Sequence, residues 1–212
     1  MHPMIDGAGH RAHRAAGFTL VELMVTVGIF GFLLAFGVPA MSRWSQATKA
    51  VATSEFYAEG FRLARAQALR HNSDSRIRLT ENANGRLDWQ VDICFATPEM
   101  ACTDAGASWS TVDAIAGGDP EGANGYKSVL RRADGLPGSG QLTHTIAPLG
   151  ASDVYYTPLG WVNPAFAGRL QRITLSPATA GAFPNSAVAV TLAGMAIKCA
   201  PDAPDHDSRK CP

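Results

Sequence analysis

The most apolar stretch of this chain lies close to its N-terminus. Residues 23–41, LMVTVGIFGFLLAFGVPAM, contain no charged side chain. A helix of this length spans about 28 Å at ~1.5 Å per residue, which is close to the ~30 Å hydrocarbon core of a bilayer. The pattern therefore predicts one membrane-spanning helix, and no other stretch of the sequence approaches it.

Helical signals continue beyond this stretch. Residues 42–70 contain no proline and are rich in Ala, Arg, Gln and Leu, which favour helix. We expect Glu59 to pair with Arg62, one turn later, and residues 71–74 (HNSD) to end the helix. The predicted packing face consists of residues at helical spacing: Ala52, Phe56, Gly60 and Leu63.

From residue 75 onward, polar and apolar residues alternate, which indicates half-buried strands. Asn84-Gly85 predicts a hairpin between the first two strands, and Ala193-Gly194 predicts one between the last two. The fold class is therefore α+β, with an antiparallel β domain packed on one long helix. The expected strands cover residues 75–80, 87–93, 128–131, 142–146, 154–157, 170–175, 187–192 and 196–199.

The residues around the apolar stretch decide how it is used. Arg11 and Arg14 precede it, and positive charge keeps that end in the cytoplasm, so the rest of the chain would lie beyond the inner membrane. A cleaved signal peptide, with Val38-Pro39-Ala40 as a loose cleavage site, and a plain anchor are two interpretations. Neither gains from Glu22, because a carboxylate in hydrocarbon costs ~2.5–3.5 kcal/mol.

Residues 17–22 carry a third interpretation. Gly17-Phe18-Thr19-Leu20-Val21-Glu22 resembles the processing motif of type IV prepilins and type II secretion pseudopilins. The resemblance implies that prepilin peptidase cuts after Gly17 and methylates Phe18. It also implies that Glu22 pairs with the amine of an incoming subunit and sets the assembly register, although the same pairing within one chain stays open. Gly31 and Pro39 match family positions where the helix loosens or kinks.

This resemblance also implies a division of the chain. Residues 1–17 would be a leader, 18–42 a hydrophobic helix for membrane and filament core, 43–73 an amphipathic helix and 74–212 a periplasmic head. The protein would span the inner membrane once and then enter a filament, at its tip. Its partners would be prepilin peptidase, other pilins or pseudopilins, and inner-membrane lipid.

A second match narrows the family. Ala64-Arg65, Ala68, Leu69 and Arg70, followed by the first strand, resemble the helix end of the GspH/FimT family. That family includes minor pilins and the H-class minor pseudopilins of type II secretion. The resemblance implies a type IV pilin-like fold and a minor pilin that primes or joins a pilus. An H-class pseudopilin is the alternative.

DNA binding for natural transformation is a further alternative. Some members of this family bind DNA near the C-terminus, around a Gly-Arg-x-Arg element. The comparable place reads Gly194-Met195-Ala196-Ile197-Lys198 and lacks both arginines. Lys198, Arg209 and Lys210 remain as candidate contacts, but residues 198–210 hold three bases and three acids. Because phosphate binding relies on positive local charge, nucleic acid is a weak candidate partner.

Four cysteines, Cys94, Cys102, Cys199 and Cys211, would lie in the oxidising periplasm, where disulfides persist. Three pairings are open. We favour Cys94–Cys102 with Cys199–Cys211, because these close the shortest loops, and the family commonly restrains its C-terminal region in this way. No C-x₂-C pair or neighbouring histidine pair points to a metal site.

Charge and motifs complete the picture. The chain carries 18 basic and 18 acidic residues, and a net charge of zero weighs against general polyanion binding. Residues 43–86 hold eight bases and four acids, whereas residues 88–121 hold seven acids and no base. This pattern is typical of solvated faces and loops, and charge-complementary docking between subunits is the alternative. No G-x-S-x-G, H-E-x-x-H or Walker motif is present, so we expect no enzyme, cofactor or metal.

Overall fold

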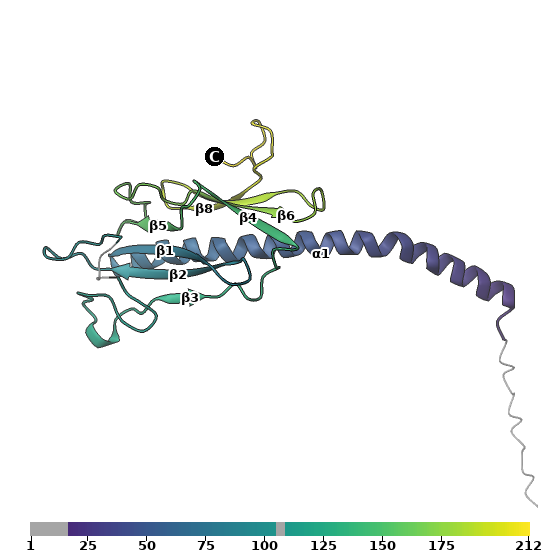
Figure 1. Cartoon of the computed structure of the whole chain (residues 1–212), viewed down its shortest axis with the longest axis horizontal. Helices are drawn as coiled ribbons and strands as arrows, with labels where there is room; N and C mark the ends of the chain where they lie inside the picture. Colours follow the sequence, from purple (N-terminus) through teal and green to yellow (C-terminus); the bar gives the residue numbers. More distant parts are fainter. Residues whose placement is uncertain (1–16, 105–108) are drawn as a thin grey trace, which may run out of the picture. The chain divides into compact units, whose positions relative to one another are not determined.

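The computed structural model describes residues 17–104 and 109–212. The expected leader, apart from Gly17, lies outside these ranges. The described residues form one long helix, α1 (Leu20–His71), a short 3₁₀ turn, η1 (Gly122–Asn124), and eight strands (Figure 1). The strands are β1 (Asp74–Glu81), β2 (Leu87–Cys94), β3 (Val129–Arg131), β4 (Leu142–Ala147), β5 (Asp153–Tyr156), β6 (Arg172–Pro177), β7 (Ser186–Val190) and β8 (Ala196–Cys199).

This arrangement confirms the expected α+β class, and each expected strand is found within two residues of its predicted bounds. The strands form two four-stranded sheets, in the orders β3-β2-β1-β5 and β4-β6-β7-β8 (Figure 1). Every pairing is antiparallel, including the two predicted hairpins β1–β2 and β7–β8. The division into two sheets arises because β5 returns to pair with β1, while β4 pairs with β6.

The chain separates into two compact units, Met1–Ser42 and Arg43–Pro212. The second unit, called the head unit below, contains the last part of α1 together with both sheets. The helix is continuous through the boundary. It ends at His71, and Asn72 then takes a left-handed conformation (φ 45°), which confirms the predicted helix stop.

The face of α1 that packs in the head unit differs from the predicted one. Ala52 is exposed, and Phe56 and Leu63 are only half-buried, although Gly60 is buried as expected. The aromatic side chains that reach the core are instead Tyr57 and Phe61. The buried face is therefore rotated by about one residue around the helix from the predicted one. The buried helix residues are Ala50, Thr53, Ser54, Tyr57, Ala58, Gly60, Phe61, Ala64 and Ala68.

Small helix residues allow α1 to lie close to the first sheet. A Cβ on Gly60 would stand 2.7 Å from Cδ1 of Ile77 and 3.0 Å from Cδ2 of Trp89. Trp89 is fully buried, and its Nε1–H donates to the carbonyl of Phe56 at 3.0 Å. Ser75 Oγ donates to the carbonyl of Ala64 at 2.6 Å. The helix is thus fastened to β1 and β2 by hydrogen bonds as well as apolar contact.

The expected ion pair on the helix surface is not the one that forms. Arg62 pairs with Glu55 at 3.1 Å, two turns earlier, and Glu59 pairs with Arg131 at 3.4 Å. Arg131 ends β3, so the sheet brings a base to Glu59 that the local sequence could not supply.

Candidate assembly site

The first turn of α1 coincides with the proposed processing motif. The hydroxyl of Thr19 accepts a hydrogen bond from the backbone N–H of Glu22 at 3.2 Å, and the Thr19 carbonyl accepts one from Leu23 at 3.1 Å. Thr19 is therefore the N-cap and Glu22 the third helical residue, which is the spacing of a Thr-x-x-Glu capping box. This role of Thr19 was not predicted, although the Thr-x-x-Glu signature is present in the sequence.

This cap places Glu22 where a carboxylate is favoured. The helix N-terminus carries partial positive charge, which attracts an acid in the first turn. The Glu22 side chain is exposed. Phe18 comes just before the cap and is 83% exposed. A carboxylate and the following apolar helix are thus both available to partners outside the chain.

The apolar part of α1 is exposed throughout its length. Every residue from Gly17 to Trp44 is classed as exposed, including the large apolar side chains from Leu20 to Met41. Among the described residues, α1 is the one helix long and apolar enough to cross a membrane, judged by length and composition. Because exposing apolar surface to water is unfavourable, such a helix is more stable in hydrocarbon or packed against other apolar helices.

Gly28, Gly31, Gly37 and Pro39 lie within this exposed helix. Apart from adjacent residues and the helix's own nearby backbone, no described atom lies within 4 Å of a Cβ placed on any of the three glycines, so neighbouring helices have room to approach there. Pro39 lies inside α1 and has no N–H to donate to the carbonyl of Ala35. The helix nevertheless runs through both Gly31 and Pro39.

Comparison with known families assigns the chain. Residues 12–38 match the prokaryotic N-terminal methylation motif. Residues 53–194, more than half of the chain, match the family of the type II transport protein GspH. The chain belongs to the GspH family. No solved structure matches it.

GspH is a family of pilin-like structural subunits. The two matches cover the features described above: the capped, apolar helix carries the methylation motif, and the GspH match covers the last part of α1 and strands β1 to β7. The chain is thus a minor pilin or pseudopilin of type IV pili or type II secretion. Residues 195–212 lie outside both matches.

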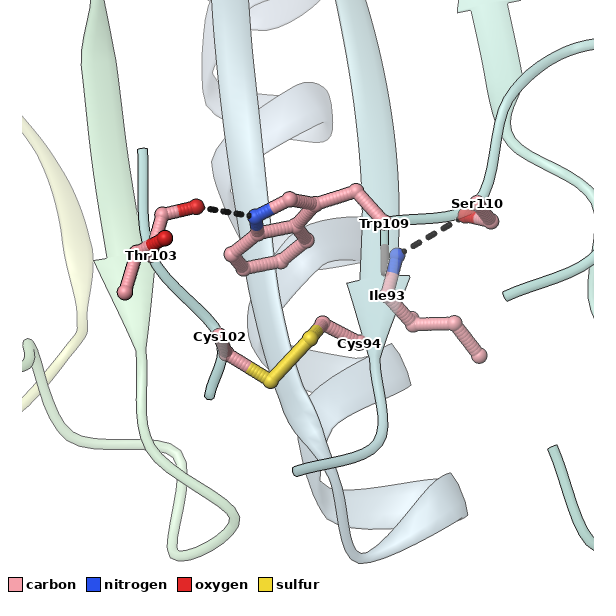
Figure 2. Close-up of a disulfide and its surroundings, with 6 residues drawn as sticks. All are labelled: Ile93, Cys94, Cys102, Thr103, Trp109 and Ser110. Atoms are coloured by element: carbon pink, nitrogen blue, oxygen red, sulfur yellow. Dashed lines mark hydrogen bonds between the residues drawn. A yellow bond between two sulfur atoms is a disulfide. The ribbon is translucent and has the colours of Figure 1, made fainter. Parts of the chain in front are cut away.

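The cysteines of this GspH-family chain form two disulfides in the structure. Cys94, at the end of β2, bonds Cys102, with an S–S distance of 2.04 Å. Beside it, Trp109 Nε1–H donates to the Thr103 carbonyl at 2.8 Å (Figure 2). Cys199, at the end of β8, bonds Cys211. Each bridge therefore fastens an irregular segment to the end of a strand.

The C-terminal bridge closes over the outer face of the second sheet. Cys199 and Cys211 pack in a small apolar cluster with Ala187 and Ala189 of β7. The backbone N–H of Ala200 donates to the carbonyl of Arg209 at 2.7 Å. The tail between the two cysteines is thereby held as an ordered loop.

All three candidate DNA contacts are already paired with acids. Lys198 pairs with Glu55, Arg209 with Asp207 at 2.7 Å, and Lys210 with Asp205 at 3.0 Å. Hydrogen bonds from Arg209 lower the pKa of the Asp207 carboxyl to about 2. A phosphate would have to compete with these carboxylates, which further weakens the case for nucleic acid.

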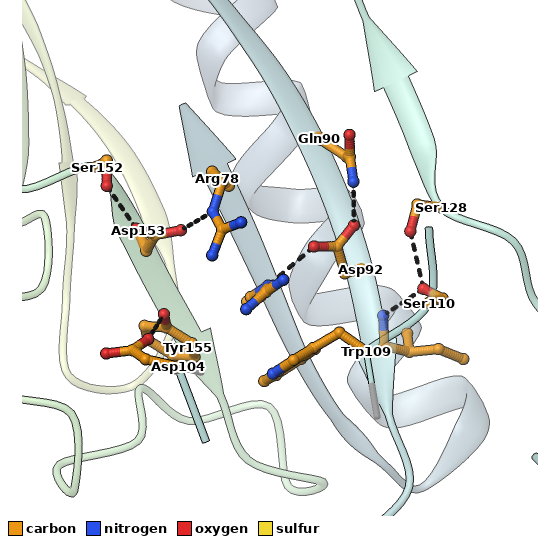
Figure 3. Close-up of polar contacts among 12 residues, drawn as sticks. Arg78, Gln90, Asp92, Asp104, Trp109, Ser110, Ser128, Ser152, Asp153 and Tyr155 are labelled. Atoms are coloured by element: carbon orange, nitrogen blue, oxygen red, sulfur yellow. Dashed lines mark hydrogen bonds and ion pairs between the residues drawn. The ribbon is translucent and has the colours of Figure 1, made fainter. Parts of the chain in front are cut away.

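A buried polar cluster on the outer face of the first sheet was not predicted. Arg76 Nε donates to Asp92 at 2.8 Å, and both side chains are more than nine-tenths buried. Gln90 donates to the other carboxylate oxygen at 2.7 Å (Figure 3). The Arg76 guanidinium also lies 4.3 Å from the ring centre of Trp109, as a cation–π contact. Burial lowers the pKa of Arg76.

Aromatic contacts complete this cluster. Tyr155 of β5 meets Trp109 edge-on at 5.9 Å and stacks on Phe166 at 3.8 Å between ring centres. The Tyr155 hydroxyl donates a hydrogen bond to the Asp104 carboxylate.

Arg76 lies opposite Asp92 in the β1–β2 register, which closes at a turn where the Asn82 N–H donates to the Arg86 carbonyl. A two-residue turn at Asn84-Gly85 would instead place Arg76 opposite Ile93, so the hairpin signal alone does not find the ion pair. The contact between Arg76 and the Trp109 ring cannot be predicted from the local sequence of either residue.

This polar and aromatic cluster therefore holds the segment that carries Trp109 against the first sheet. Across the described residues, no group of three or more His, Cys, Asp or Glu side chains is placed to hold a metal ion. The features directed at partners are instead the exposed apolar helix and its capped first turn.

Proposed function

We propose that this protein is a minor pilin-like subunit, cut by prepilin peptidase after Gly17, methylated on Phe18, and then built into a filament through α1. The observation that supports this best is the position of the helix start. The methylation motif spans residues 12–38, and the Thr19 cap begins α1 two residues after the proposed cut. Cleavage would therefore leave a short free end on an ordered helix.

Glu22 is proposed as the register residue. Cleavage creates an α-amine on Phe18, close along the chain to the Glu22 carboxylate. In an apolar filament core a lone carboxylate is costly, whereas a paired one is much less so. The amine of an incoming subunit would pair with Glu22 of its neighbour and fix their axial offset. Gly31 and Pro39 would let the helix loosen during assembly.

The proposed division of the chain follows from this pathway. Residues 1–17 are the leader, 18–42 the membrane and filament-core helix, 43–73 the amphipathic helix and 74–212 the periplasmic head. Two disulfides fit an oxidising compartment on the far side of the inner membrane. Prepilin peptidase, other pilins or pseudopilins and membrane lipid are the partners, and the filament tip is the proposed position.

One observation favours the H-class pseudopilin of a type II secretion system as a second candidate. The matching family is described as a type II transport protein. Deletion of the gene in its own host separates the two: loss of surface pili with normal secretion supports the pilus role. Loss of secreted enzymes with normal pili supports the secretion role.

The N-terminus of the mature protein tests the proposal directly. Mass spectrometry of the protein purified from its own host membranes should find a chain that begins at Phe18 and carries one N-methyl group. Gly17→Asp should abolish the cut, whereas Gly9→Asp in the leader should leave it unchanged. A mature chain that begins at Met41 would instead establish a secretory signal peptide.

A further inference from the structure

Exposed apolar side chains gather at one place on the head unit. Eleven large apolar side chains are exposed among the described residues of this unit, and five belong to three neighbouring segments. The five, called the apolar hollow below, are Leu69 (48% exposed), Leu159 (67%), Trp161 (61%), Leu192 (67%) and Met195 (53%). Clustered exposure of this kind marks an interaction site, whereas scattered apolar residues do not.

Two glycines build the hollow from segments far apart in the sequence. Gly160 and Gly194 both have positive φ, 74° and 76°. A Cβ on Gly194 would stand 2.0 Å from the Gly160 carbonyl oxygen, and one on Gly160 would stand 3.0 Å from Cγ of Leu69. The turn before β8, the turn after β5 and the end of α1 therefore meet here without intervening side chains.

Hydrogen bonds hold these segments in place. Val162 N–H donates to the Leu192 carbonyl at 3.0 Å, and Arg65 Nε donates to the Gly160 carbonyl at 3.0 Å. Between Leu69 and Met195 lies an open depression of about 250 Å³. The surface is thus preformed, so binding of a partner would require little loss of conformational entropy in these segments.

The edge of the hollow is basic. Arg62 and Arg65 line the depression, and no carboxylate lines it. Glu55 pairs with both Arg62 and Lys198, so a single acid is shared by two of the three bases on this side. Trp, Met and Arg are the side chains enriched at protein interfaces. The matching surface would therefore be apolar at its centre and acidic at its edge.

We propose that the apolar hollow docks the head of a different, neighbouring pilin-like subunit, through an apolar surface with an acidic edge. This rests on the proposed function, which places the head unit beside other heads in a filament. The choice of a protein occupant follows from the charge: Arg62 and Arg65, beside exposed aromatic and aliphatic side chains, complement an apolar protein surface with an acidic edge. A second copy of this chain and lipid are the competing occupants.

Site-specific photocrosslinking in the native host tests the proposal on the full chain. A photoreactive amino acid at Leu192 probes the hollow, and one at Leu149, which is 99% exposed between β4 and β5, is the matched control. We expect Leu192 to capture one other protein that itself carries a prepilin-type N-terminus, at a yield about tenfold above Leu149.

Charge reversal adds a second arm. Arg62→Glu in the Leu192 crosslinking chain should lower the yield about tenfold, because it opposes an acidic edge. Arg132→Glu, at an exposed position after β3, should leave it unchanged. Equal yields at Leu192 and Leu149, capture of lipid or of a second copy alone, or no effect of Arg62→Glu would overturn the proposal.

The same samples separate this inference from the proposed function. If the N-terminus begins at Phe18 and the protein enters filaments, but Leu192 captures no pilin-like partner, only the docking surface is wrong. If the chain is not cut after Gly17, the proposed function itself fails.

Discussion

Gly60 contributes to the head unit by having no side chain where α1 crosses β1 and β2. The ring of Trp89 and the end of Ile77 occupy the space that a Cβ would need. On the opposite face of the first sheet, Arg76 and Asp92 are buried as a pair, and each keeps the other's charge compensated. At this scale, stability depends on single atoms placed in a closely packed interior.

Gly60→Ala is expected to destabilise the full-length protein by about 1–3 kcal/mol, because the new methyl group overlaps Ile77. Because alanine has a higher helix propensity than glycine, the substitution would otherwise stabilise the helix, so a net loss of stability reflects the steric overlap. Urea denaturation in detergent measures the change. Gly135→Ala, which meets no atom within 4 Å, is the control, and equal midpoints for the two variants would contradict the prediction.

Arg76→Met is expected to lower the free energy of unfolding by about 3–5 kcal/mol, because it leaves the Asp92 carboxylate buried without its base. Arg78→Met is the matched control on the same strand. Its pair with Asp153 is partly exposed, so a loss under about 1 kcal/mol is expected. Adding Asp92→Leu to Arg76→Met should recover much of the loss; a double variant as unstable as the single one would refute the explanation.

The Asp207 carboxyl should titrate well below an ordinary aspartate, since hydrogen bonds from Arg209 hold its pKa at about 2. A lowered folded-state pKa means that the pair stabilises the tail above the unfolded pKa of about 4 and loses this effect as pH falls toward 2. NMR titration of the carboxyl measures it. In Arg209→Gln the midpoint should move up toward 4, and an unchanged midpoint would disprove the assignment.

At the scale of elements, the strand ends and the helix start carry the special chemistry. Thr19 caps α1 two residues after the proposed cut, so the helix start is defined by residues that would remain after cleavage. β2 and β8 each end in a cysteine whose partner lies in an irregular segment. The Cys199–Cys211 bridge thus orders residues 200–210, which have few apolar residues of their own.

Replacing Cys199 and Cys211 by serine is expected to destabilise the C-terminal segment by about 2–3 kcal/mol, from the length of the closed loop. Loss of the bridge should expose the tail and speed trypsin cleavage after Arg209 in the full-length protein. The Cys94→Ser, Cys102→Ser variant is the control, in which this cleavage should stay slow. Similar rates in both variants would show that the tail is held by other contacts.

For the whole molecule, the two units differ in the surfaces that they expose. The first unit exposes apolar side chains along its helix, whereas the head unit buries many of its large apolar residues in a core shared by α1 and both sheets. A subunit of this kind can be held in a membrane by one unit and present the other to its neighbours. Assembly then depends on how the exposed helix is matched, which is the proposed role of Glu22.

Glu22→Ala should leave membrane insertion and head stability intact, because the side chain is exposed and lies in the first unit. Incorporation into sheared filaments should fall at least tenfold, a loss of about 1.4 kcal/mol or more, because the proposed pairing with the Phe18 amine is removed. Immunoblots of membrane and filament fractions measure both. Glu121→Ala, an exposed acid in the head unit, should incorporate normally; normal incorporation of Glu22→Ala would exclude the register role.

Local pattern by itself determined much of this protein. The uncharged run of residues 23–41, the strand bounds and both hairpins follow from the sequence because helix and strand periods and turn residues act over a few positions. The processing motif is equally local. Only the tertiary structure decided that β5 pairs with β1, that Trp109 covers Arg76, and that Leu69 meets the turns around Gly160 and Gly194. These contacts join segments far apart in the chain, and their choice depends on how all the apolar faces are buried together, which no short window of residues encodes.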